Sequence, residues 1–217
     1  MLLLAKSQKY NNYCVAGIDI ANNKLVRLVS NDENIHNALT PEDMEYKEGG
    51  EAEVGELVEV VIDKRCPDCL QPENIMINTG QYIKKIKDDE ISFENYECNK
   101  EYVFYDTSNK IHTNELQSKD DVYSLQLIKA EVVEVNVRYY SDSQRYKVYM
   151  DFCFNGRCYN NFSITDAGFR DYYINSYIDT NQSNYCFDED LLLLVSLGEV
   201  YDGNSCHYKL VASVMSV

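Results

Sequence analysis

Two pairs of cysteines have spacings at which thiols can act together. The first pair, Cys66 and Cys69, forms the motif CPDC, which is typical of half a structural zinc site or of a redox-active loop. The chain has no second C-x-x-C motif that would complete a zinc site. Free thiols, a zinc site and redox chemistry are therefore three open interpretations. A zinc site would need two more ligands, which the sequence gives no reason to bring near, and we predict that no metal is bound.

The second pair, Cys153 and Cys158, encloses the sequence FNGR. An Asn-Gly pair is typical of a two-residue type I′ turn, because both turn positions need positive φ. The spacing therefore predicts a hairpin in which Cys153 and Cys158 lie directly opposite each other. This geometry allows a disulfide, whereas a reducing compartment favours two adjacent thiols.

The chain lacks the motifs by which many enzymes are recognised from sequence. It has no P-loop and no G-x-G-x-x-G, G-x-S-x-G or H-E-x-x-H motif. Its histidines, His36, His112 and His207, have no neighbouring serine or cysteine in an arrangement that suggests a triad. We therefore predict a protein that is not an enzyme and that uses no cofactor.

The charge of the chain opposes a general attraction to phosphate. Its formal net charge is -16 over 217 residues, and its pI is about 4.5. The stretch 41–59 alone contains eight acidic residues and one lysine. Such a run is typical of a solvated surface. Alternatively, it repels nucleic acid or docks a basic protein.

Alternating apolar residues predict a mainly β protein. Helix signals are short: Thr40 with Pro41, Thr165 or Asp166, and Ser92 are candidate starts, although Thr165 and Asp166 are also open to ligand contact. The apolar runs are too short to cross a bilayer, so we expect a cytoplasmic protein without membrane contact. The predicted strands are 2–6, 13–20, 24–30, 56–63, 124–140, 145–154, 157–164, 191–197 and 208–214.

The polar stretch 105–121 is the least periodic part of the chain, and we place a domain boundary there. The division gives a first domain at 1–113 and a second at 114–217. Each domain has about 100 residues, which suffices for a Greek-key barrel of about five strands. The two halves are not obvious repeats of each other.

Several stretches together resemble the prokaryotic dual OB-containing domain family. They are LLLAKSQKYNNYCVAGIDIANNKLVRLVS, MEYKEGGEAEVGELVEVVI and QPENI in the first half, and SLQLIKAEVVEV, VYMDFCFNGRCYNNFSITDAGF and HYKLVASVM in the second. The resemblance covers most of the chain. It implies two tandem OB-like Greek-key barrels that form a non-enzymatic module. It further implies binding of single-stranded nucleic acid or a nucleotide, in a bacterial conflict or phage-defence setting.

OB barrels bind single strands on an exposed sheet face with cations and aromatic rings. On this basis we expect a ligand site on the first three strands, with Lys6 and Arg27 as exposed cations that face phosphates. Arg27 can also be an ordinary strand cation, and the QPENI residues can lock their loop rather than touch a ligand. The candidate ligand-binding residues are Lys6, Lys9, Tyr10, Tyr13, Arg27, Gln71 and Asn74.

A second function is compatible with the same sequence. The chain can be an adaptor subunit that docks a larger protein effector through its acidic face or through an exposed β-edge. A basic strip on the folded protein favours nucleic-acid binding, whereas a large acidic or apolar patch favours the adaptor.

Overall fold

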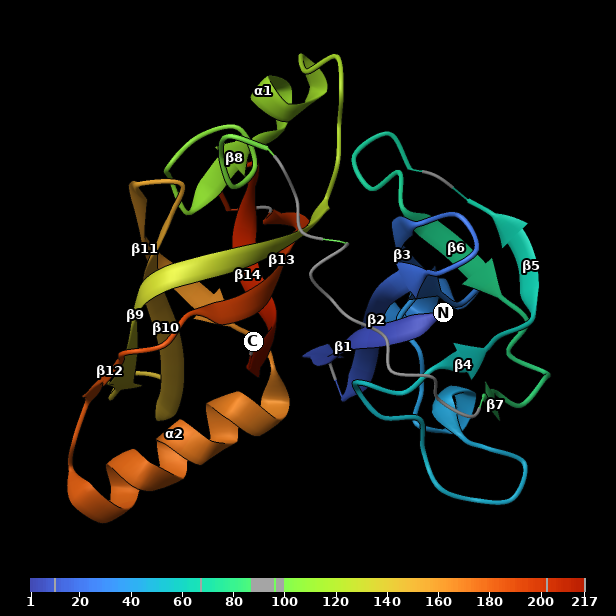
Figure 1. The fold of residues 1–217 in the computed structure, drawn as a ribbon, viewed down its shortest axis with the longest axis horizontal. Helices are drawn as coiled ribbons and strands as arrows, with labels where there is room; N and C mark the ends of the chain where they lie inside the picture. Colours follow the sequence, from blue (N-terminus) through green and yellow to red (C-terminus); the bar gives the residue numbers. More distant parts are fainter. Residues whose placement is uncertain (10, 67, 87–95, 97–99, 202, 217) are drawn as a thin grey trace. The chain divides into compact units, whose positions relative to one another are not determined.

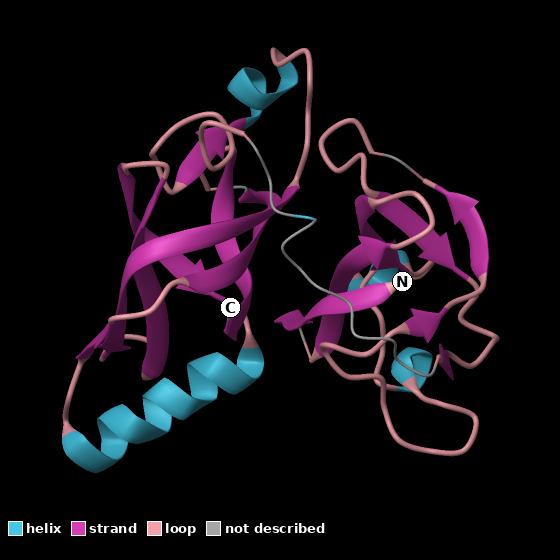
Figure 2. Cartoon of the chain, in the orientation of Figure 1, coloured by secondary structure: helices cyan, strands magenta, loops and turns pink. Residues whose placement is uncertain are grey.

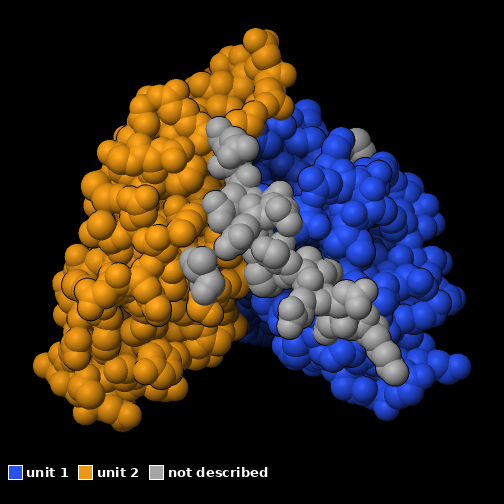
Figure 3. Space-filling view, viewed as in Figure 1, with its two compact units in different colours: residues 1–96, 122–125 blue, residues 97–121, 126–217 orange. Residues whose placement is uncertain are grey.

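The computed structural model describes residues 1–217 except 10, 67, 87–95, 97–99, 202 and 217. It has two compact units (Figure 3). The first contains residues 1–96 and 122–125, and the second contains residues 97–121 and 126–217. The sequence placed the boundary at residue 113. Residues 97–113 instead belong with the second unit, where β8 (Lys110–His112) pairs with β14 (Cys206–Ser216).

The first unit is built on a five-stranded sheet with the order β1-β2-β3-β6-β5 (Figure 1). Neighbouring strands are antiparallel except for β3 and β6, which run parallel. The strands predicted at 13–20 and 24–30 are present and form a hairpin, and Asn23 in its turn has φ 55°. The strands are β1 (Leu2–Lys9), β2 (Asn12–Asp19), β3 (Lys24–Val29), β5 (Ile62–Arg65) and β6 (Asn74–Ile77).

The stretch 57–65 closes this sheet into a barrel. Leu57 forms a bridge with Leu2 at one edge, and Ile62 pairs with Ile77 at the other edge. The two strands in this part, β4 (Val58–Glu59) and β5, together correspond to the single strand predicted at 56–63, and β4 also pairs with β7 (Lys84–Lys85). The barrel interior is apolar, with Leu3, Val15, Leu28, Leu39, Met44, Val58 and Ile77 in its core.

The connection after β3 contains two short 3-10 helices, η1 (Glu33–Ile35) and η2 (Glu42–Met44). The helix expected after Thr40 is therefore a single turn. Thr40 and Asp43 exchange hydrogen bonds: the Thr40 amide donates to Asp43 Oδ2 at 2.8 Å, and the Asp43 amide donates to Thr40 Oγ1 at 3.3 Å. The two residues therefore cap the turn reciprocally. The backbone is extended again at Glu45, so the helix does not continue.

The second unit is also a closed barrel, because β9 pairs with β10 on one side and with β13 on the other. Its order β9-β10-β11-β14-β13 repeats the connectivity of the first barrel, including the parallel pair β11 and β14. Strand β12 adds to β9, and β8 adds to β14. The further strands are β9 (Leu125–Tyr140), β10 (Arg145–Phe154), β11 (Arg157–Ile164), β12 (Asn184–Phe187) and β13 (Leu191–Tyr201).

The predicted β10–β11 hairpin is confirmed. Asn155 and Gly156 have φ of 50° and 70°, as a type I′ turn requires, and Cys153 pairs directly with Cys158. Both strands have the ends that the sequence predicted.

Two α-helices belong to the second unit (Figure 2): α1 (Thr113–Gln117) and α2 (Ala167–Thr180). Helix α2 follows β11 and packs against β10 and β11. The Asp166 carboxylate accepts a hydrogen bond from the Phe169 amide at 3.0 Å, which confirms the predicted cap. Most of the helix proposed after Ser92 lies outside the described residues. None of the helices in the described part has the length and apolar composition that a bilayer crossing requires.

Candidate functional site

Lys6 of β1 is neutralised by the acidic run of its own barrel. Its Nζ donates to Glu53 Oε1 at 2.8 Å, to Glu51 Oε2 at 3.2 Å and to the Ala52 carbonyl at 3.1 Å. Burial opposes the shift, but the hydrogen bonds with Glu53 and Glu51 raise the pKa of Lys6. Only 12% of the side chain is exposed. The expectation of an exposed, phosphate-facing Lys6 is therefore corrected.

Tyr13 belongs to the same group. Its hydroxyl donates to Glu51 Oε2 at 3.1 Å, and Lys6 Nζ lies 5.2 Å from the centre of its ring. Lys9 ends β1 and pairs with Asn12. Tyr10 lies outside the described residues. The structure thus brings together Lys6 and Tyr13 around a carboxylate.

Arg27 is buried, with 6% of its surface exposed, although it lies on the outer side of β3. Its Nη1 donates to Asn74 Oδ1 at 3.0 Å and to Ser124 Oγ at 2.9 Å. Its Nη2 donates to the Ser124 carbonyl at 3.3 Å. The expectation of an exposed Arg27 is wrong, because residues 97 positions later in the chain cover it.

The QPENI loop completes this arrangement. The Glu73 carboxylate accepts hydrogen bonds from the Ser124 amide at 2.8 Å, from Ser124 Oγ at 2.7 Å and from the Leu125 amide at 3.3 Å. Asn74 Nδ2 donates to Gln71 Oε1 at 3.3 Å. We call Arg27, Gln71, Glu73, Asn74 and Ser124 the latch. In the latch, Gln71 and Asn74 have the loop-locking role that was one of their two interpretations.

Much of the acidic run also pairs within the first unit. Glu59 accepts from Lys84 Nζ at 2.7 Å, and Glu56 accepts from Lys85 Nζ and from the Tyr46 hydroxyl, the latter at 2.5 Å. Burial opposes the shift, but the hydrogen bonds from Lys85 and Tyr46 lower the pKa of Glu56 to about 2. Together with Glu51 and Glu53, four of the eight acids thus contact lysines of the same unit.

The outer face of β9 and β10 has a different chemistry. Alternate residues of a strand point to opposite sides, and the buried Val135, Val137 and Val148 mark the inner side. The outer side therefore carries the residues between them, with cations and tyrosines from both strands. They are Asn136, Arg138 and Tyr140 on β9, and Arg145, Lys147 and Tyr149 on β10.

Four of these side chains form a crossed arrangement, which we call the clamp: Arg138, Tyr140, Lys147 and Tyr149. Arg138 and Lys147 are direct cross-strand partners, and each lies over a tyrosine of the other strand. The Arg138 guanidinium carbon lies 4.7 Å from the centre of the Tyr149 ring, and Lys147 Nζ lies 5.5 Å from that of Tyr140. The two tyrosine hydroxyls are 3.1 Å apart.

A β-bulge in β11 fixes the position of Arg138. Asn161 has φ 59°, and the β10–β11 register shifts beside it. The Asn161 amide donates to Asp151 Oδ1 at 2.6 Å, which holds the bulge against β10. Arg138 Nη2 then donates to Asn161 Oδ1 at 2.6 Å. An aromatic ring and an amide oxygen thus hold the guanidinium, while Arg138 stays exposed.

The clamp is locally positive in an acidic protein. Residues 138–149 contain three basic residues and one acidic residue. The hydrogen bond with Tyr149 lowers the pKa of Tyr140, and Arg138 and Lys147 act in the same direction. Burial raises the pKa of Tyr149 to about 12. Exposed cations held over rings can bind an anionic group without first being ordered.

A family model, the dual OB-containing domain (DuOB), matches residues 1–214. The chain belongs to this family. No curated protein and no solved structure matches the sequence. The family and the two barrels confirm the resemblance seen in the sequence and make this DuOB chain an OB-type binding module.

The sequence contained a signal for the clamp that the candidate list missed. VRYYSDSQRYKVY interleaves basic and aromatic residues around a turn, a pattern found where OB folds bind single strands. The whole DuOB chain has nineteen tyrosines and a net charge of -16, so a short basic and aromatic segment does not stand out in its composition. The candidate list therefore named only the first barrel.

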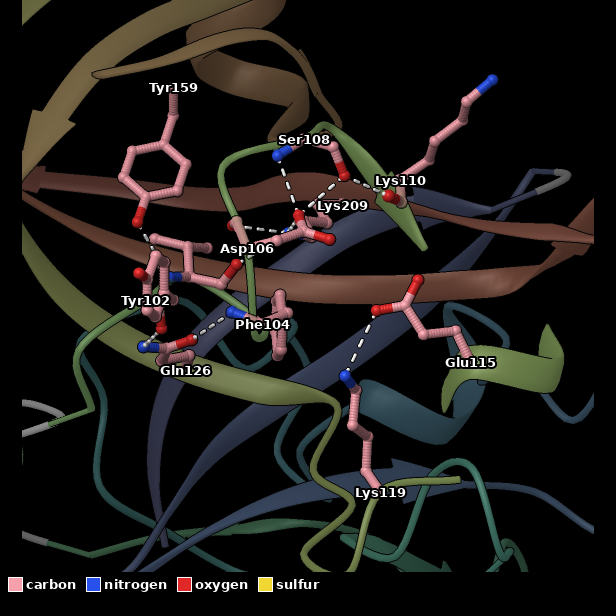
Figure 4. Close-up of polar contacts among 11 residues, drawn as sticks. Tyr102, Phe104, Asp106, Ser108, Lys110, Glu115, Lys119, Gln126, Tyr159 and Lys209 are labelled. Atoms are coloured by element: carbon pink, nitrogen blue, oxygen red, sulfur yellow. Dashed lines mark hydrogen bonds and ion pairs between the residues drawn. The ribbon is translucent and has the colours of Figure 1, made fainter. Parts of the chain in front are cut away.

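A second buried cation, Lys209 of β14, serves the fold of the second barrel (Figure 4). Its Nζ donates to the Val103 carbonyl at 2.8 Å, to the Asp106 carbonyl at 2.9 Å and to Asp106 Oδ1 at 2.7 Å. Tyr159 Oη accepts a hydrogen bond from the Val103 amide at 3.2 Å. We call residues 100–109 the strap. Val103 and Phe104 of the strap are completely buried. Lys209 anchors the strap through its three hydrogen bonds with Val103 and Asp106.

The part of the DuOB chain that the structure describes contains no group of three or more His, Cys, Asp or Glu side chains arranged to hold a metal ion. Cys66 and Cys69 are free thiols, the first half-buried and the second exposed.

Proposed function

We propose that this DuOB chain is a non-enzymatic module that binds single-stranded nucleic acid or a nucleotide on the β9–β10 face of its second barrel. The observation that supports this proposal is the clamp, in which two exposed cations are already held over tyrosine rings. In OB folds the ligand face lies on the second and third strands, which correspond to β10 and β11. Lys147 and Tyr149 of the clamp lie on β10, and Arg138 of β9 donates to Asn161 of β11.

The clamp suits a phosphate group. Arg138 presents a planar fork of donors, of which one already bonds to Asn161, and Lys147 lies directly across the strand pair. Ordering a long cationic side chain costs about 0.5–1.5 kcal/mol on binding. Contacts with Tyr149, Tyr140 and Asn161 reduce this cost for the two cations.

The affinity should be modest and local in origin. A net charge of -16 gives little long-range attraction to a polyanion, so few phosphates contribute. We expect about one to three released counterions per bound strand, and therefore a shallow salt dependence. A role in bacterial conflict or phage defence is part of this proposal and fits a module that recognises nucleic acid or a nucleotide.

The test compares two double charge reversals by fluorescence anisotropy at low salt. Labelled oligothymidylate, oligouridylate and a labelled adenine nucleotide are the probes. Arg138→Glu with Lys147→Glu should weaken binding by about ten-fold or more. Lys24→Glu with Lys64→Glu is the matched control, because these exposed lysines of the first barrel give the same change in net charge. The control should retain most of the affinity.

Two outcomes would overturn the proposal. One is a wild-type chain that binds none of the probes at low salt, and the other is an equal loss of affinity in both double variants. In either case an adaptor that docks a larger protein effector becomes the leading function. Pairing of four acids in the run 41–59 with lysines leaves less of that run for such docking.

A further inference from the structure

The β10–β11 hairpin holds two thiols in direct opposition. The Phe154–Arg157 pair closes the two-residue turn, so the next pair, Cys153 and Cys158, is a non-hydrogen-bonded pair of the antiparallel ladder. Cα atoms in such pairs lie about 4.5 Å apart, which falls within the range of about 4.4–6.8 Å that a disulfide spans. No change of register is therefore needed to join the two sulfur atoms.

The two thiols differ in access, and the pKa of Cys153 is raised. Cys158 is exposed and Cys153 is half-buried. The hydrogen bond with Cys158 raises the pKa of Cys153 to about 11, and burial and Glu131 contribute to the rise. Thiolates, not thiols, attack disulfides, so Cys158 is the residue that meets an external disulfide first.

We propose that Cys153 and Cys158 form a reversible dithiol–disulfide site that exchanges with low-molecular-weight disulfides such as oxidised glutathione. The Cys158 thiolate attacks one sulfur of the disulfide, whose S–S bond breaks, and one glutathione leaves and takes up a proton. Cys153 then loses its proton and attacks Cys158 Sγ, which releases the second glutathione. Two protein thiols are oxidised to one disulfide, while oxidised glutathione is reduced to two thiols.

Cys158 raises the pKa of Cys153 in the reduced protein, and the loss of this effect favours the second step. A mixed disulfide on Cys158 carries no thiolate charge and no thiol proton. The contributions of Cys158 to the high pKa of Cys153, of which its hydrogen bond is the largest, are then removed, and Cys153 becomes a better nucleophile beside its target. This inference does not depend on nucleic-acid binding, because it rests on the hairpin alone.

The experiment incubates the reduced full-length chain with oxidised and reduced glutathione under native conditions. Acid quenching, alkylation and peptide mass mapping then locate the products. The expected product is a Cys153–Cys158 link with the mass of two hydrogen atoms lost. It should also form in the Cys66→Ser, Cys69→Ser background, which removes the C-x-x-C pair. Cys153→Ser should accumulate one glutathione on Cys158, whereas Cys158→Ser should leave Cys153 reduced.

Three results would overturn the proposal. The first is that Cys153 and Cys158 of the wild-type chain remain as open to alkylation as the exposed Cys186. The second is that Cys153→Ser traps no glutathione on Cys158. The third is that the link forms equally fast in a denaturant, because the strand pairing would then not direct it. The first and third readouts use the wild-type chain and do not depend on how a variant folds.

Discussion

The two barrels have the same strand connectivity but use their outer faces differently. In the first, one row across four strands consists of Ala5, Ala16, Arg27 and Asn74. In the second, the corresponding row consists of Asn136, Tyr149, Ser163 and Leu210. The row of the first barrel has small residues on two strands, and its only charged residue, Arg27, contacts Ser124. The row of the second barrel has an exposed neighbouring cation stacked on Tyr149.

This difference shows that strand order alone does not assign a binding face. Ala5 and Ala16 are buried, and the arginine beside them is held by backbone and side-chain oxygens of the same unit. Tyr149 and its neighbours instead hold cations toward solvent. The same architecture therefore supports a chain latch in one barrel and a candidate ligand face in the other.

The largest expected effect comes from the buried cation of the second barrel. Lys209→Met removes the donor to the carbonyls of Val103 and Asp106, and it leaves the Asp106 carboxylate only its hydrogen bonds from Ser108. Breaking a buried charged pair costs about 3–5 kcal/mol, so the free energy of unfolding should fall by about 3 kcal/mol. Urea unfolding followed by circular dichroism measures this loss.

The matched control for this prediction is Lys110→Met, which removes an exposed lysine from the adjacent strand β8. It should cost less than about 1 kcal/mol. Equal losses in the two variants would show that Lys209 does not anchor the strap.

A smaller effect is expected from the latch of the first barrel. Glu73→Ala removes the carboxylate that accepts three hydrogen bonds. The amides of Ser124 and Leu125 and the Ser124 hydroxyl then lose this acceptor. We expect a loss of about 2 kcal/mol and faster proteolytic cleavage near residues 122–125.

Glu48→Ala serves as the control for the latch, because it removes a carboxylate from an exposed turn of the same barrel. If cleavage near residue 124 is unchanged in Glu73→Ala, the latch does not hold this segment in solution.

The smallest expected effect is a pH-dependent loss of stability when Glu56 of the first barrel is replaced. Glu56 has a pKa of about 2 in the folded first barrel and an ordinary value near 4.5, so its contribution to stability is complete above about pH 4.5 and is lost as the pH falls toward 2. Glu56→Gln should therefore lower stability by about 1 kcal/mol near pH 6, and less near pH 3.

Urea midpoints at the two pH values measure this difference. Tyr46→Phe, which removes one donor to Glu56, should give the same trend with a smaller size. A Glu56→Gln deficit that stays constant between the two pH values would contradict the assignment.

Local sequence patterns predicted the features that depend on near neighbours. The Asn155–Gly156 turn set the register of Cys153 and Cys158, and Asp166 capped α2, because both signals act within a few residues. The burial of Arg27 could not be predicted in this way. Its partner Ser124 lies 97 residues away, and an arginine in an alternating strand looks the same whether its outer face is open or covered.

The candidate site shows the same limit. Lys6 and Arg27 are cations on early strands, but Glu53, which pairs with Lys6, and Ser124, which covers Arg27, lie in segments that no periodicity places beside them. The Arg138–Tyr149 and Lys147–Tyr140 contacts need only a hairpin register and were within reach of the sequence. Their place on a closed barrel follows from the pairing of β9 with both β10 and β13, which no local pattern in the sequence predicts.

The latch also bears on the order in which the chain folds during synthesis. Ser124 lies in the short segment 122–125 that belongs to the first unit, and β9, a barrel strand of the second unit, begins at the next residue. A ribosome therefore releases every strand of the first barrel before the residue that covers Arg27 emerges. Until then, the nascent first barrel exposes a cation and the carboxylate of Glu73 that the finished protein pairs with this segment.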